Sequence, residues 1–195
     1  MAEEPGWQIF GLPIRGRSCG SCHACCTHVP VELATRHKPA GIKCTHLRAG
    51  GCGIYADRPS GCAAWNCRWL FDPGVVEAGL RRPDLAGYII DPMLCTIMAN
   101  GEPLDVAQIW ADPKRPLAHR DPALRAYLVR LCATHGLLAL VRHAIPGEGL
   151  LLIPPAKSAT GEWLELDAPL VSDAQVTRNP AYRPSQMRLT ATLGR

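Results

Sequence analysis

Short apolar runs separated by turn residues characterise the middle of the chain. Residues 86–91, 94–99 and 104–110 are each rich in Ile, Leu, Val or aromatic side chains, and Asp-Pro and Asn-Gly dipeptides bound them. Apolar runs of this length between turn signals are typical of β-strands, and Asn100-Gly101 is a favoured dipeptide for a two-residue hairpin turn. The pattern predicts three strands in an antiparallel meander.

The next segment has helical periodicity. Its apolar positions recur every three or four residues, at Leu124, Leu128, Leu131 and Cys132. Asp121 can accept hydrogen bonds from the free amides of a first helical turn, Pro122 fits that turn, and Gly136 suits the exit. The sequence therefore predicts one well-defined helix, with Arg125 and Arg130 off its apolar face.

Further strands are predicted after this helix, over residues 137–145, 150–153 and 163–166. Residues 168–195 show no such pattern, and we expect them to form an extended C-terminal tail. The fold class predicted is α+β, in which residues 71–167 form a scaffold of an antiparallel β-sheet and one main α-helix.

Residues 1–70 differ from this scaffold in character. They are punctuated by Gly, Pro and Cys, and residues 31–36 fit either a short helix or a strand. Large apolar side chains are few in the cysteine-rich part, so burial alone is not expected to fold it. Small metal-binding domains solve this problem because their metal-binding free energy also drives folding. We expect a loop-rich, N-terminal metal module that packs on the sheet.

Cysteine is concentrated in this module. Eight of the ten cysteines lie in it: Cys19, Cys22, Cys25, Cys26, Cys44, Cys52, Cys62 and Cys67. The acidic first residues contain no apolar leader, and no stretch approaches the ~20 apolar residues of a membrane span. These features predict a cytoplasmic protein with no membrane partner. In that reducing compartment, clustered cysteines bind metal more often than they form disulfides.

The spacing of the cysteines fits thiolate ligation. A Cys-x2-Cys turn lets two sulfurs reach one metal, and Gly20 eases the first such turn. Cys25 and Cys26 are adjacent, so their side chains diverge and suit two metals or different irons of a cluster. Eight thiolates would fill two four-thiolate zinc sites, or one 4Fe–4S cluster with thiols to spare. Zinc, iron and iron–sulfur all remain open.

The net charge of +4 resides in the module. Residues 1–70 contain eight Lys and Arg against four acidic residues, and the rest of the chain has thirteen of each. A nucleic-acid patch is one interpretation. We favour charge compensation, because eight thiolates with two divalent ions carry four net negative charges and the basic residues are scattered rather than in a run.

The cysteine pattern resembles a known family. The matching motifs are Cys19-x2-Cys22-x2-Cys25-Cys26, Lys43-Cys44, Gly51-Cys52-Gly-Ile-Tyr55, Arg58-Pro59-Ser-Gly-Cys62 and Asn66-Cys67. They are similar to the YkgJ-like cysteine-cluster family, which is described as a zinc- or iron-chelating domain. The resemblance covers roughly residues 15–70 and implies that the eight cysteines are the metal ligands.

This chain departs from the family at one turn. It has Cys62-Ala-Ala-Trp65 where the family commonly has Cys-Arg-x-Phe, and Arg68 is the residue we expect to replace the missing arginine. The family also includes flagellin lysine N-methylases, thought to use S-adenosylmethionine. The chain shows no additional cofactor motif, so the resemblance does not carry that activity over.

Other residues are expected to be structural. Cys95 and Cys132 should pack in the core. Tyr55, Trp65 and Trp69 should form an apolar plug between metal and sheet, rather than stack a nucleobase. We expect solvated or hydrogen-bonded roles for His23, His28, His37 and His46, and surface positions for His119, His135 and His143.

The function predicted is metal binding, in a structural or metal-handling role. One alternative is an iron–sulfur protein with a redox or radical, methylase-like role. A second is a zinc-stabilised nucleic-acid-binding protein. No catalytic residue can be named, because the chain has no Ser-His-Asp spacing, phosphate loop or paired-carboxylate motif.

Overall fold

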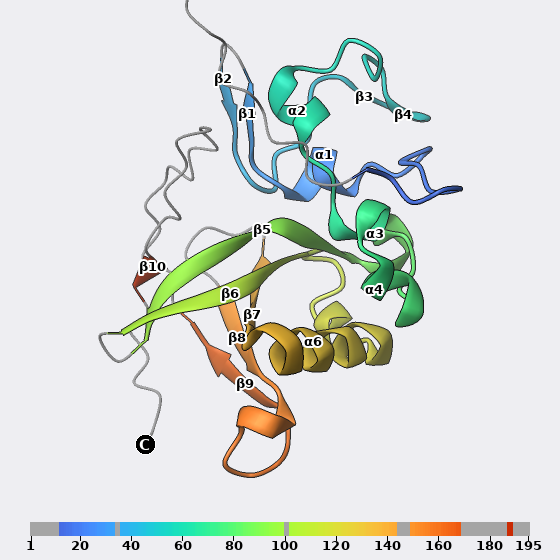
Figure 1. The fold of residues 1–195 in the computed structure, drawn as a ribbon. Helices are drawn as coiled ribbons and strands as arrows, with labels where there is room; N and C mark the ends of the chain where they lie inside the picture. Colours follow the sequence, from blue (N-terminus) through green and yellow to red (C-terminus); the bar gives the residue numbers. More distant parts are fainter. Residues whose placement is uncertain (1–11, 34–35, 100–101, 144–148, 169–186, 189–195) are drawn as a thin grey trace, which may run out of the picture.

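The chain folds as an α+β protein with a mostly antiparallel sheet and one main helix (Figure 1). The computed structural model describes residues 12–33, 36–99, 102–143, 149–168 and 187–188. Its main sheet has the strand order β10-β5-β6-β7-β8-β9. These strands are β5 (Tyr88–Ala99), β6 (Glu102–Ala111), β7 (Leu138–His143), β8 (Gly149–Ile153), β9 (Leu164–Asp167) and β10 (Met187–Arg188).

Strand β5 corrects one prediction. The strands predicted over residues 86–91 and 94–99 are one strand, β5, which begins at Tyr88 and pairs antiparallel with β6 on both sides of an interruption. The register shifts between Ile90 and Leu94, so the Asp91-Pro92 dipeptide forms an irregularity within β5 instead of ending it. Proline cannot donate to a strand ladder, which explains why pairing is interrupted there. The predicted turn at residues 100–101 lies outside the described residues.

The sheet departs from the expected antiparallel pairing at one junction. Strands β6 and β7 pair in parallel, with Val106 opposite Leu138, because α6 (Pro122–His135) connects them. A parallel pair needs such a crossover, whereas hairpins give antiparallel pairs. Strands β7, β8 and β9 follow one another antiparallel, as predicted.

The ends of α6 lie where the sequence places them. The carboxylate of Asp121 accepts a hydrogen bond from the backbone N–H of Ala123 at 2.9 Å, and Gly136 ends the helix with a φ of 70°. The predicted apolar positions are buried, and Tyr127 joins them because its ring lies on the same face. A short 3-10 turn, η1 (Ala118–Arg120), precedes the helix.

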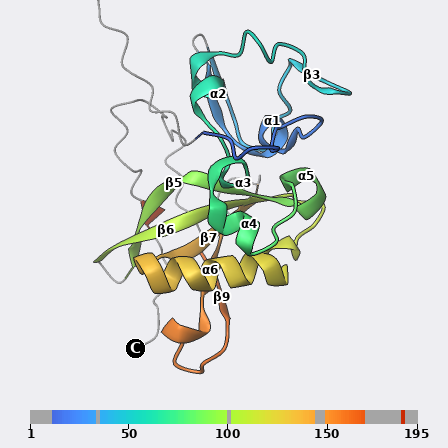
Figure 2. The ribbon, with the colours of Figure 1, turned by 45° about the vertical axis from the view of Figure 1, so that its right-hand side comes forward.

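The sheet is covered on both faces (Figures 1 and 2). Side chains alternate along each strand, so Tyr88 and Ile90 pack in one apolar cluster with α6 while Ile89 faces the other way. Ile89 and Trp110 pack with Val29 and other residues of the first 70. The cysteine module therefore lies on the face of the sheet opposite α6.

The cysteine module, residues 1–70, is built from short elements. These are α1 (Ala24–His28), β1 (Val31–Leu33), β2 (Arg36–Lys38), β3 (Leu47–Arg48), β4 (Gly51–Cys52), α2 (Ser60–Ala64) and the start of α3 (Arg68–Phe71). Of residues 31–36, which the sequence left undecided, Val31–Leu33 form β1 and Arg36 begins β2, and the two strands pair antiparallel. A second small hairpin is β3–β4.

Three more short elements complete the described part: α4 (Pro73–Glu77), α5 (Pro83–Ala86) and η2 (Pro155–Lys157). Most of the tail predicted over residues 168–195 lies outside the described residues, and β10 within it pairs in parallel with β5. Across the described ranges, no helix has the length and apolar character needed to cross a bilayer.

Candidate metal centre

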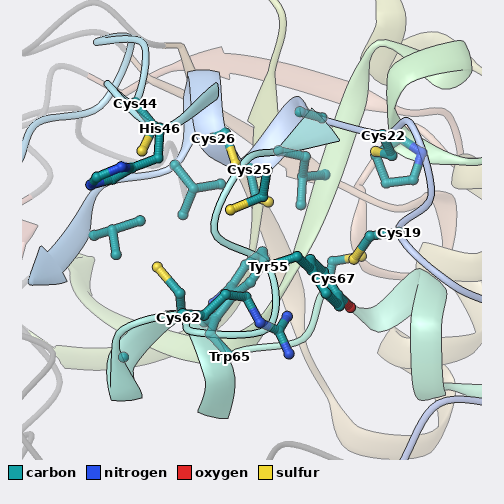
Figure 3. A pocket seen from close by; sticks show the side chains of 18 of the residues that line it. Cys19, Cys22, Cys25, Cys26, Cys44, His46, Tyr55, Cys62, Trp65 and Cys67 are labelled. Atoms are coloured by element: carbon teal, nitrogen blue, oxygen red, sulfur yellow. The ribbon is translucent and has the colours of Figure 1, made fainter. Parts of the chain in front are cut away.

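One cavity of ≈ 100 Å³ collects the cysteines of the module. All eight predicted ligands line it: Cys19, Cys22, Cys25, Cys26, Cys44, Cys52, Cys62 and Cys67. Figure 3 labels all of these cysteines except Cys52. They come from separate parts of the module, including α1, the β3–β4 hairpin, α2 and the residue before α3. Residues 48 positions apart in sequence thus meet at one site.

Local geometry explains why the ligand loops approach one another. In the first Cys-x2-Cys turn the N–H of Cys22 donates to the carbonyl of Cys19 at 2.8 Å, and Gly20 has a φ of 49° as the tight turn requires. Gly51 has a φ of 116°, and a Cβ there would lie 2.9 Å from the carbonyl oxygen of Gly20. A glycine at position 51 therefore lets β4 lie against the first cysteine turn.

The thiols are not cross-linked. All ten cysteines lie in described residues, and each is free. In the same part of the chain, no three His, Cys, Asp or Glu side chains converge closely enough to hold a metal ion as they stand. The cysteines line the wall of the cavity, so ligation requires their sulfurs to move closer together. The donor set of eight thiols in one cavity fits zinc or iron.

Burial raises the pKa of three of these thiols, Cys22, Cys62 and Cys67. Burial raises the pKa of Cys67 to about 12, and the backbone amides of Leu70 and Trp69 oppose this by hydrogen bonding to its sulfur. Burial raises the pKa of Cys62 to about 11, aided by neighbouring thiolate charges. A metal would have to displace these protons, which is the usual coupling between thiolate ligation and pH.

The adjacent pair behaves differently. Cys25 and Cys26 are hydrogen-bonded to each other, and this bond lowers the pKa of Cys26 while it raises that of Cys25. Burial opposes the shift at Cys26, whereas the positive charge of Lys38 favours it. Cys26 is therefore the first of the two to ionise.

Basic side chains surround the cavity. Lys38 and Arg58 line it directly. Lys38 is only 7% exposed and donates to the carbonyls of Pro39 and Ile42, at 3.2 and 2.8 Å. The scattered basic residues of the module thus include cations positioned to offset thiolate charge.

The predicted replacement for the family arginine is not at the cavity. Arg68 donates to the backbone carbonyl of Asp91 at 3.2 Å and to the carboxylate of Asp72 at 3.1 Å. Arg58 occupies the cavity wall instead, with its guanidinium 3.9 Å from the ring centre of Tyr55.

Aromatic side chains also line the cavity. Tyr55, Trp65 and Trp69 all line the cavity, as expected of the apolar plug. The indole N–H of Trp65 donates to the carboxylate of Asp91 in β5 at 3.3 Å, so this plug is joined to the sheet. Tyr55 is 48% exposed and closes the outer side.

The structure also tests some of the remaining predictions on histidine and cysteine. His46 is the histidine that lines the cavity, among the described residues, and His23 contacts the carbonyl of Ser21. Cys95 and Cys132 are buried in β5 and α6, as predicted. The prediction for His119 was wrong: it is 3% exposed, because η1 places it under β9, where its ring lies 3.4 Å from Glu165.

No family model, curated protein or solved structure gives a significant match to this chain. The likeness to the YkgJ-like family therefore rests on the cysteine motifs themselves.

Proposed function

We propose that this protein binds zinc or iron through the thiolates of its eight clustered cysteines, in a structural or metal-handling role. The main support for the proposal is which cysteines lie at the cavity and which do not. All eight cysteines of the motif line one cavity, whereas Cys95 and Cys132 are buried elsewhere. Cysteines that are buried only for packing would not be expected to gather at one cavity.

The surroundings of the cavity suit an anionic centre. Thiolates bound to zinc or iron keep negative charge, which Lys38 and Arg58 partly neutralise. Backbone amides hydrogen-bond to the sulfurs of Cys22 and Cys67, as outer-shell donors do around metal-bound thiolates. Trp65 and the other aromatic wall residues limit access by water.

Zinc as a structural or stored ion is the preferred form of the proposal. A closed shell of four cysteines leaves no open position for a reacting water. The reducing cytoplasm suits such a site, because thiols there stay available as ligands. Membership of the YkgJ-like family is part of the same proposal, and it carries no methylase activity with it.

Paired cysteine variants test the proposal. Cys62→Ser should lower the metal content of protein purified without oxygen, because it removes a sulfur from the cavity wall. Cys95→Ala is the matched control and should retain the full content. Equal metal loss in both variants would refute the ligand set. A brown protein whose visible absorption is bleached by reductant would select iron–sulfur over zinc.

A further inference from the structure

The eight cysteines fall into two groups within the cavity. In Figure 3, Cys25 and Cys26 lie side by side at the centre of the view. Cys19, Cys22 and Cys67 lie on one side of this pair, and Cys44 and Cys62 lie on the other. The adjacent pair therefore stands at the boundary between the two groups.

An inner group consists of Cys19, Cys22, Cys25 and Cys67. Cys67 is 8% exposed and belongs to the apolar cluster that contains Ile89 and Trp110 of the sheet. The other three cysteines of the group pack against that same cluster. Electrostatic coupling gives the same grouping, since Cys67 interacts with Cys19 and Cys22. The inner group is thus built onto the sheet.

An outer group consists of Cys26, Cys44, Cys52 and Cys62. The thiolates close enough to act electrostatically on Cys62 are those of the other three. The backbone N–H of Cys44 donates to the carbonyl of Cys26 at 2.9 Å, which ties two of the segments together. In the described parts of the chain, no member of this group belongs to any of the three apolar clusters.

The helix that carries the central pair explains the division. Cys25 and Cys26 are consecutive in α1, and consecutive side chains of a helix point about 100° apart. This divergence favours a separate ion for each thiolate over one shared tetrahedral ion. Each can face one of two neighbouring ions, and the hydrogen bond between the two thiols shows how close those centres would be.

The cations divide in the same way. Arg17 interacts electrostatically with Cys67, and Arg82 with Cys19 and Cys22. Lys38 interacts with Cys26, and Arg58 with Cys62. Two cations thus lie near each group and offset part of the negative charge that four thiolates with a divalent ion would carry. Asp84 forms an ion pair with Arg82 at 2.7 Å and offsets part of its charge.

We propose that the eight cysteines form two separate four-thiolate centres, and that the outer centre releases its metal before the inner one. The inner centre uses Cys19, Cys22, Cys25 and Cys67, and the outer centre uses Cys26, Cys44, Cys52 and Cys62. This inference rests on the proposed function. The order of release follows from packing: the inner cysteines pack in the apolar cluster that includes residues of the sheet, whereas no outer cysteine belongs to an apolar cluster of the described residues.

Cobalt titration of the full-length protein tests the division, because thiolate-bound Co²⁺ is a spectroscopic stand-in for tetrahedral zinc. The wild type and Cys132→Ala should each bind two equivalents. Cys22→Ser and Cys52→Ser should each bind one, with sheet structure verified by circular dichroism. Absence of binding by the wild type would refute the proposed function itself. Binding that is lost completely in either folded variant would point to one shared cluster and refute the division alone.

The rate of metal release provides a second measurement, and its wild-type arm does not depend on the folding of any variant. A competing chelator added to zinc-loaded protein should remove the metal in two phases of equal amplitude. Cys52→Ser loaded with zinc should show the slow phase alone. A single phase in the wild type, or a fast phase that survives in Cys52→Ser, would overturn the order of release.

Discussion

The carboxylate of Asp91 accepts a hydrogen bond from the indole N–H of Trp110 at 2.9 Å. It also accepts from Trp65 of the cysteine module at 3.3 Å and from the backbone N–H of Met93 at 3.0 Å. Asp91 is 1% exposed and lies at the irregular step of β5. One buried acceptor therefore joins the wall of the cavity to the sheet.

Asp91→Asn should destabilise this joint. An amide has one acceptor oxygen where the carboxylate has two, so one buried indole N–H would face an NH2 group. Leaving a buried donor unsatisfied costs about 1–3 kcal/mol, and the free energy of unfolding in urea should fall by that amount. Asp105→Asn, at an exposed position of β6, is the control and should change it little. Equal effects of the two substitutions would contradict this account of the joint.

Gly51→Ala should weaken metal binding. Its φ of 116° is unfavourable for alanine, and the new Cβ would meet the carbonyl of Gly20 at 2.9 Å. Strain of this kind costs about 1–3 kcal/mol, so metal affinity in a chelator competition should fall about 5- to 150-fold. Gly50→Ala is the matched control for Gly51→Ala, because a Cβ at position 50 would have no atom within 4 Å beyond those of its chain neighbours. If both variants bound metal equally, the close approach of the two loops would not matter for the site.

The Glu165 carboxylate should make a pH-dependent contribution to stability. Hydrogen bonds from Arg120 lower its pKa from the model-compound value of 4.5, with further help from His119. Because the pKa is lower in the folded state, this contribution is present above the unfolded pKa and is lost as the pH falls through the folded value. Glu165→Gln should lower Tm by a few degrees at pH 7.

The control for this prediction is Glu162→Gln, an exposed neighbour that should have little effect at any pH. The difference in Tm between the wild type and Glu165→Gln should shrink below about pH 4.5. A difference that stayed constant down to pH 3 would mean that the charge of Glu165 is not what stabilises the contact between β9 and η1.

Local signals predicted much of the fold. Asp121, Pro122 and Gly136 mark the ends of α6 because capping depends on nearby backbone groups. The pairing of β6 with β7 was missed, since strand direction depends on the path of the chain across the sheet. The Asp91-Pro92 step was misinterpreted because a proline that ends one strand and a proline that interrupts a strand look alike in sequence.

The cysteine positions could be identified as a set, but their arrangement could not. Spacing brings Cys19 and Cys22 together locally, whereas the position of Cys67 beside them depends on α3 packing against the sheet. The same holds for Lys38, whose place in the cavity wall results from the β1–β2 hairpin. Contacts made through tertiary packing leave no periodic trace in the sequence.

The metal content of the wild-type protein, purified without oxygen and measured by elemental analysis, tests the central claim most directly. The account predicts stoichiometric zinc or iron that is retained through gel filtration, with few thiols reactive towards a disulfide reagent until the protein is denatured. Metal-free, folded protein with eight reactive thiols in the module, or with those thiols paired as disulfides, would contradict it.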